Sequence, residues 1–150
     1  MSDAEASICF GYVLGDIAES YNNWVKPLYD TIADLAWYES DIEDLYLEYV
    51  GAKIDEGMDY KVERDFKRRM IQKCPFVLLQ YEYWDSDKYI LAIRESVKTA
   101  SSYIPLGLNM ENMIKDEEKW TLELSEICKK LGLEPPKTEV PKYFLSANEQ

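Results

Sequence analysis

The spacing of apolar residues changes along the chain, and each spacing predicts a type of element. From residue 7 to residue 14 the apolar side chains alternate, which is typical of a β-strand, although Gly11 weakens this prediction slightly. Residues 27–56 follow a helical period instead. Pro27 suits the first position of such a helix, and Gly57 suits the position beyond its end.

Two further signals concern the number of helices between residues 27 and 73. Ser40 and Glu43 form a capping box, so the segment is either one continuous helix or two helices with a break near Ser40. Residues 59–73 predict another helix, which a short connection should hold antiparallel to the one before it. The predicted core stripe of this helix consists of Val62, Phe66 and Met70.

Residues 76–97 predict a β-hairpin, because two apolar, β-rich segments flank the turn-forming residues 85–87. A three-residue loop pairs Leu79 with Ile93 and makes one face of the hairpin wholly apolar, whereas a two-residue loop mixes the faces. We expect the three-residue loop, because a one-residue slip is costly when one face is buried. The other, polar face would then carry Gln80, Glu82 and Arg94.

The last third of the chain predicts one more helix and one more strand. The helix begins near Asn109 or Glu111 and ends at Gly132, a residue suited to a helix cap. Its predicted core stripe consists of Met113, Trp120, Leu124, Ile127 and Leu131. Residues 140–145 predict a strand at an edge of the sheet, because the proline at position 141 has no N–H to donate.

This order of elements predicts an α+β fold. A small, mainly antiparallel sheet, built from the N-terminal strand and the 76–97 hairpin, would be covered by three to four helices. We expect a single α+β domain over residues 1–133 and an extended C-terminal tail over residues 134–150. The uncharged stretches are too short to cross a bilayer, and the acidic N-terminus does not resemble a secretory signal. We therefore expect a cytoplasmic protein without membrane contact.

Charge is distributed unevenly along the chain. Residues 1–60 contain 14 Asp and Glu but only two Lys, a net charge of −12 that equals the net charge of the whole protein. Residues 61–75 reverse the sign, with six Lys and Arg against two acids. Because so acidic a segment repels itself, we expect solvent, the basic segment or a cationic partner to balance it.

Six of the nine acids of residues 27–56 gather on one side of a helical wheel, within about 40° of Asp30. This acidic stripe consists of Asp30, Asp34, Asp41, Asp44, Glu48 and Asp55, with Trp37 among them. The stripe is either a solvated helix face or a binding surface, which could occupy a site made for nucleic-acid phosphates or bind any basic protein groove. Trp37 is either an aromatic anchor in that surface or, if the helix breaks, a core side chain.

The spacing and the sign of the charges argue against two roles for the charged segments. One acid per roughly 7 Å along the stripe is sparser than the phosphates of a DNA strand, about 3.4 Å apart, which argues against close mimicry of DNA. The basic run consists of Lys61, Arg64, Lys67, Arg68, Arg69 and Lys73. Direct nucleic-acid binding by this run is disfavoured by the surrounding negative charge, so we expect the basic helix to pack beside the stripe and neutralise or rim it.

The residue inventory excludes several kinds of chemistry. The chain has no histidine, which removes nucleophile–histidine catalysis and the commonest metal ligand. Cys9, Cys74 and Cys128 are widely spaced and lack a CxxC pattern, so we expect reduced core thiols. The two aspartates of residues 85–87 are ordinary turn residues. We therefore predict neither a cofactor nor a metal.

The preferred hypothesis is a non-enzymatic acidic binding protein, of an inhibitor or immunity type, that engages the basic surface of a nucleic-acid-handling enzyme. Its predicted contact residues are Asp30, Asp34, Trp37, Asp41, Asp44 and Glu48. The alternative is a small-ligand-binding protein or a histidine-independent enzyme that uses the polar hairpin face of Gln80, Glu82 and Arg94. Self-association, in which another chain balances the charge, is a third possibility.

Overall fold

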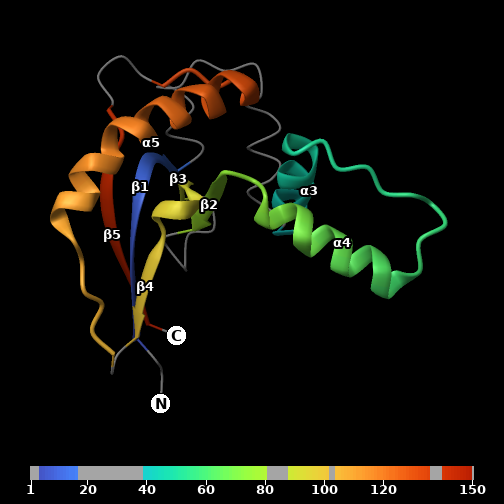
Figure 1. Cartoon of the computed structure of the whole chain (residues 1–150), viewed down its shortest axis with the longest axis horizontal. Coiled ribbons are helices and arrows are strands. Elements are labelled where there is room, and N and C mark those ends of the chain that lie inside the picture. The colour runs from blue at the N-terminus through green and yellow to red at the C-terminus, as the bar shows by residue number, and fades with distance from the viewer. Residues whose placement is uncertain (1–3, 17–38, 81–87, 102–103, 136–139, 150) are drawn as a thin grey trace.

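The computed structural model describes residues 4–16, 39–80, 88–101, 104–135 and 140–149, which form a five-stranded antiparallel sheet and three helices (Figure 1). The strands are β1 (Ala4–Asp16), β2 (Phe76–Gln80), β3 (Lys88–Ile93), β4 (Lys98–Ser101) and β5 (Lys142–Glu149). The helices are α3 (Glu39–Tyr49), α4 (Tyr60–Gln72) and α5 (Met110–Leu131). The predicted α+β fold is therefore confirmed, with the N-terminal strand and the hairpin strands in one sheet.

The first strand organises the sheet because it pairs along both of its edges. On one edge its C-terminal half pairs with β3 and its N-terminal half pairs with β4. On the other edge it pairs with β5, and β2 extends the sheet beyond β3. The short 3-10 turn η1 (Arg94–Ser96) separates β3 from β4, so these two strands lie end to end along β1 (Figure 1).

A buried serine side chain supplies a hydrogen bond where η1 interrupts the pairing of the sheet. The backbone N–H of Phe10 donates to the Ser96 Oγ at 2.8 Å, and that hydroxyl donates to the carbonyl oxygen of Ile93 at 2.7 Å. Ser96 is only 3% exposed, so water does not replace these bonds. The hydroxyl therefore supplies the partner that a continuous strand would otherwise give to Phe10.

Replacing Ser96 by alanine is expected to lower the free energy of unfolding by about 1–3 kcal/mol, because it leaves the buried Phe10 N–H without an acceptor. Urea unfolding followed by circular dichroism measures this loss. Ser101→Ala is the matched control, since Ser101 is exposed in the neighbouring strand. Equal stability of the two variants would contradict this role for the Ser96 hydroxyl.

The main core lies between the sheet and α5 (Figure 1). Trp120 and Leu124 are buried on the inner side of α5, and the Trp120 ring lies 5.9 Å from the ring of Phe10 in β1. Tyr143 of β5 packs edge-on against Phe10 at 5.0 Å and donates its hydroxyl hydrogen to the Met113 carbonyl at 2.6 Å. These contacts hold α5 across β1 and β5.

The sequence prediction for α5 is confirmed in its limits and its buried side. The Asn109 side chain accepts a hydrogen bond from the Asn112 N–H at 3.1 Å, and Gly132 ends the helix at a φ of 72°. The residues predicted as the stripe are buried or, for Met113, half-buried. Neither α5 nor any other helix in the described ranges is both long and apolar enough to cross a membrane.

The register of the hairpin differs from both predicted registers. Leu79 pairs with Ile90, and Ile93 pairs with Phe76. As a result Phe76 and Leu78 share the α5 side of the sheet with Leu91 and Ile93, whereas Leu79 faces the opposite side. The prediction that Leu79 lies opposite Ile93 is wrong, and so is the division of the hairpin into an apolar and a polar face.

The physical reason is that the second face of the hairpin is apolar too. Cys9, Ile90 and Ala92 form a second buried cluster there, and partly buried Val77 and Leu79 pack against it. When both faces are buried, a shift of one residue exchanges one apolar set for another. Burial of an apolar face then does not distinguish one register from another.

The helix around the acidic stripe ends earlier than predicted. The described helix α3 finishes at Tyr49, and Gly51 follows with a φ of 71°, a left-handed conformation that stops a helix. The predicted end at Glu56 is therefore wrong, and Asp55 lies in the connection to α4. Whether residues 27–56 contain one helix or two concerns residues outside the described part of the chain.

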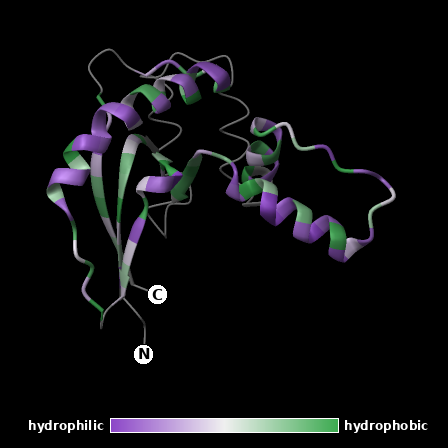
Figure 2. Cartoon of the chain, viewed as in Figure 1, coloured by the Kyte–Doolittle hydropathy of each residue, from purple (hydrophilic) through white to green (hydrophobic). Residues whose placement is uncertain are grey.

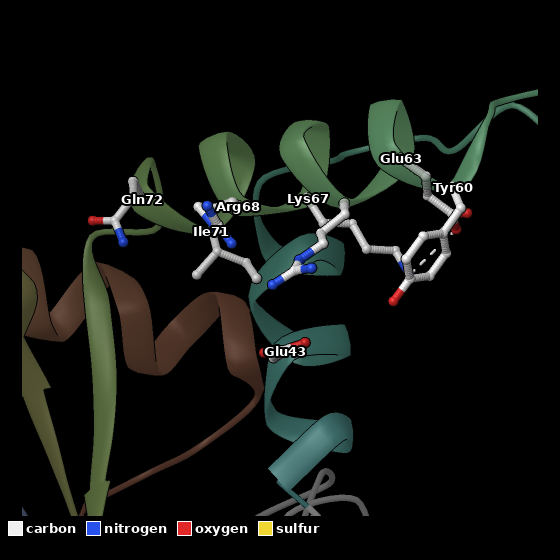
Figure 3. Close-up of a pocket in the computed structure, with 8 residues that line it drawn as sticks. Glu43, Tyr60, Glu63, Lys67, Arg68, Ile71 and Gln72 are labelled. Atoms are coloured by element: carbon white, nitrogen blue, oxygen red, sulfur yellow. Dashed lines mark ion pairs between the residues drawn. The ribbon is translucent and has the colours of Figure 1, made fainter.

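Helix α4 has the predicted limits but not the predicted core stripe. None of its residues is buried, and Val62 is 52% exposed, while Phe66 and Met70 are half-buried. It packs against α3 and lies across that helix instead of running antiparallel to it (Figures 1 and 3). The long connection over residues 50–59 permits this crossing. Figure 2 shows the hydrophilic residues that cover much of α4.

The predicted C-terminal strand is confirmed and is longer than expected. Residues 142–149 pair with β1, with Leu145 opposite Ile8 and Tyr143 opposite Phe10. Among the described residues β5 has β1 as its only neighbour, as expected for an edge strand. The division into a domain over residues 1–133 and a tail over residues 134–150 stays a prediction.

Candidate binding surfaces on helices α3 and α4

The structure places part of the predicted acidic stripe on the outer side of α3. Asp44 and Glu48 are exposed there, one helical turn apart. Asp41 lies within the described helix, but its side chain is outside the described part, as are Asp30, Asp34 and Trp37 entirely. The described acidic surface, called the α3 acidic face below, therefore consists of Asp44 and Glu48.

Buried side chains on the opposite side of α3 determine which way the acids point. Leu45 and Tyr46 are buried in the main core, and the Tyr46 ring packs edge-on against Phe76 at 5.5 Å. The Tyr46 hydroxyl also accepts a hydrogen bond from the Leu78 N–H at 2.8 Å. Because Leu78 lies in β2, this bond ties α3 to the sheet and leaves Asp44 and Glu48 facing solvent.

The end of α3 is held by α5. The Nζ of Lys130 donates to the carbonyl oxygen of Tyr49 at 2.7 Å and lies 4.1 Å from the centre of the Tyr49 ring. A cation beside the last carbonyl groups of a helix is favourable because those groups carry partial negative charge. The α3 acidic face thus stands on a helix that is anchored at its C-terminal end.

The basic residues of α4 do not neutralise the α3 acidic face. Lys67 forms an ion pair with Glu63 at 3.3 Å within its own helix, as the four-residue spacing predicts. Arg69 donates to the backbone carbonyl of Asp65 at 3.5 Å. Within the part of the chain that the structure describes, no ion pair joins α3 to α4. The expected neutralisation of the stripe by the basic helix is therefore absent from Asp44 and Glu48.

The two helices instead enclose an open groove of about 570 Å³, called the α3–α4 groove below (Figure 3). Its lining residues are Glu43 from α3 and Tyr60, Glu63, Arg64, Lys67, Arg68, Ile71 and Gln72 from α4. Three of these side chains are basic and two are acidic. Sequence reasoning missed this groove, although the four-residue spacing of Arg64 and Arg68 indicated that both lie on one side of α4.

Of the alternative site on the hairpin, the structure describes the side chain of Arg94 alone. The Arg94 Nε donates to the Cys74 carbonyl at 2.8 Å, and one terminal nitrogen lies 3.5 Å from the Phe76 carbonyl. The guanidinium also lies 5.5 Å from the centre of the Tyr46 ring. Arg94 therefore connects β2 to α3, while Glu82 and the side chain of Gln80 lie outside the described part.

The three cysteines are free and buried, as predicted. Burial raises the pKa of the thiols of Cys9 and Cys128 from 9.0 to about 11, because a charged thiolate is poorly solvated in the core. Burial also raises the pKa of Cys74, although the nearby Arg94 partly opposes this. A thiol that stays protonated at neutral pH is a poor nucleophile and a poor metal ligand. Across the described residues, His, Cys, Asp and Glu form no group of three or more that would hold a metal ion.

Comparison with protein-family models found no match, and comparisons with curated proteins and with solved structures found no significant match either.

Proposed function

We propose that this chain is a non-enzymatic cytoplasmic binding protein whose acidic surface engages a basic surface of a partner protein. The observation that carries the proposal is the α3 acidic face, in which Asp44 and Glu48 are exposed and have no ion-pair partner among the described residues. In the intact surface, Asp30, Asp34, Trp37 and Asp41 are the further proposed contact residues.

Electrostatics favour this use of the surface. Like charges four residues apart on a helix cost a few tenths of a kcal/mol, and a cationic partner would relieve that repulsion. The net charge of −12 would also accelerate the encounter with a basic protein. Because α3 is tied to β2 through Tyr46 and to α5 through Lys130, the acids are presented on a preorganised helix.

The proposed partner is a nucleic-acid-handling enzyme, and the proposed role is that of an inhibitor or immunity-type protein. Enzymes of this class carry basic grooves for phosphates, which an acidic helix can occupy. The alternative use of Gln80, Glu82 and Arg94 as a small-ligand or catalytic site has less support, because the Arg94 guanidinium already donates to a backbone carbonyl.

Reversing both charges of the α3 acidic face, with Asp44→Lys and Glu48→Lys, is expected to weaken capture of basic partner proteins by about tenfold or more, since like charges then face each other. The measurement is affinity capture from native lysate at low and high salt, with quantitative mass spectrometry. An excess of double-stranded DNA should displace a partner that is held through its nucleic-acid surface.

The matched control is Glu118→Lys with Glu126→Lys, which changes the net charge equally at two exposed positions of α5. Captured proteins that disappear from the α3 variant but remain with the α5 variant support the proposal. If both variants retain every captured protein, or lose them equally, the α3 acidic face is not the binding surface.

A further inference from the structure

The α3–α4 groove is a second charged feature, and its chemistry is opposite to that of the α3 acidic face. Lys67 is already paired with Glu63, whereas Arg64 and Arg68 are exposed and have no ion-pair partner within the described ranges. We propose that this groove binds an extended acidic peptide segment of a partner protein, with two carboxylates two residues apart seated on Arg64 and Arg68. This site is independent of the proposed function of α3.

The spacing of the two arginines supports an extended ligand. Residues four apart on a helix lie about 6 Å apart along its axis. Alternate side chains of an extended peptide point to the same side and lie about 6.6 Å apart. Each guanidinium can therefore meet one carboxylate of an acid–x–acid sequence through paired N–H donors.

The length and openness of the groove also favour a peptide. The lining runs along α4 from Tyr60 to Gln72, which corresponds to about 18 Å at 1.5 Å per residue, or five to six residues of extended chain. Tyr60 is 73% exposed at one end of the groove and Gln72 is exposed at the other, so an extended chain can enter at one end and leave at the other. Tyr60 and Ile71 offer apolar surface to the side-chain stems of the ligand (Figure 3).

The acids of the groove argue against a nucleic acid as the occupant. Glu43 stands on the α3 wall, and Glu63 neutralises Lys67. Among the described residues, Arg64, Arg68 and Glu43 of the lining have no ion-pair partner. A peptide can place two carboxylates on the arginines and direct its backbone N–H groups toward Glu43. A nucleic-acid strand continues its negative charge in both directions, toward Glu43 and the rest of a chain with a net charge of −12.

The test uses the full chain and a fluorescein-labelled peptide with the sequence Gly-Glu-Ala-Glu-Gly, followed by fluorescence anisotropy at low salt. Arg64→Gln with Arg68→Gln is expected to weaken binding by about tenfold, as for the loss of two exposed, charge-assisted contacts. The matched control is Arg69→Gln with Lys73→Gln, which removes the same charge outside the groove lining and should change the affinity by less than about twofold.

A second peptide, a charge-conserving variant and a single-stranded oligonucleotide of equal charge complete the test. The peptide Gly-Glu-Glu-Ala-Gly has the same composition but adjacent acids, and it should bind more weakly. Arg64→Lys with Arg68→Lys preserves the charge but lacks the forked donors, so its affinity for the peptide should lie between those of the wild-type chain and the glutamine variant. If the glutamine variant does not fold, the affinity of the lysine variant tests the role of the two arginines. The proposal is wrong if neither peptide binds, if both peptides bind equally, if the groove and control variants lose binding equally, or if a single-stranded oligonucleotide of equal charge binds more tightly than the peptide.

Discussion

Replacing Gly11 by alanine is expected to lower the free energy of unfolding by at least about 3 kcal/mol. A Cβ atom at this position would overlap the carbonyl oxygen of Leu91 and would crowd the Cα of Ala92 in the paired strand β3. Both atoms belong to the backbone of a hydrogen-bonded ladder, so no side-chain rotation relieves the overlap. Urea unfolding of the variant, with m-values compared to the wild-type chain, measures the loss.

Gly57→Ala is the matched control for this experiment. Apart from Gly57 and its two chain neighbours, no residue has an atom within 4 Å of the position that the Cβ would occupy, and the backbone is not in the left-handed region. This substitution should change the free energy of unfolding by less than about 1 kcal/mol, in the stabilising direction if the unfolded chain loses freedom. A Gly11→Ala protein as stable as Gly57→Ala would show that β1 and β3 do not approach as closely as described.

Raising the pH from 7 to 10 is expected to remove about 1.4 kcal/mol of stability for each of the thiols of Cys9 and Cys128. Their pKa values are about 11 in the folded protein and 9.0 ordinarily. Below pH 9 both states hold the proton and the contribution is complete. Above pH 9 the unfolded thiol ionises first, so the unfolded state binds fewer protons and stability falls until the folded thiol ionises near pH 11.

Cys9→Ala with Cys128→Ala isolates this contribution from the general loss of stability that ionising tyrosines and neutralised lysines cause at high pH. Urea unfolding at pH 7, 9 and 10 should show a smaller decrease for the double variant, by about 3 kcal/mol at pH 10. Leu122→Ala, at an exposed position of α5, should follow the wild-type pH dependence. Parallel curves for all three proteins would mean that the buried thiols do not titrate differently in the folded and unfolded states.

The limits of a helix were predictable where several local signals agree. In α5 a capping residue, a buried stripe and the terminal Gly132 all point to the same limits, and the structure agrees. In the segment 27–56 the acidic periodicity continues to Asp55, but Gly51 ends the described helix before it. Periodicity of charged residues alone carries no burial energy, so it did not outweigh a glycine in a left-handed conformation.

The candidate surfaces were predictable only residue by residue. The helical wheel placed Asp44 and Glu48 on one side of the helix, and the structure shows both exposed, with Tyr46 buried on the other side. The relation of α4 to α3 was not predictable, because the crossing of two helices depends on their packing and on the connection between them. The α3–α4 groove, with Glu43 opposite the arginines, follows from that crossing.

The sequence by itself determined the α+β class, the limits of α4 and α5, the strand character of β1 and β5, and the outward position of Asp44 and Glu48. These features depend on local periodicity, caps and the separation of apolar from polar positions. Only the tertiary structure decided the hairpin register, the role of Ser96 beside Phe10, and the groove between α3 and α4. Each of these depends on contacts between residues that are far apart in the sequence. A hairpin with two apolar faces, or a pair of charged helices, can pack in more than one arrangement with the same local pattern of residues.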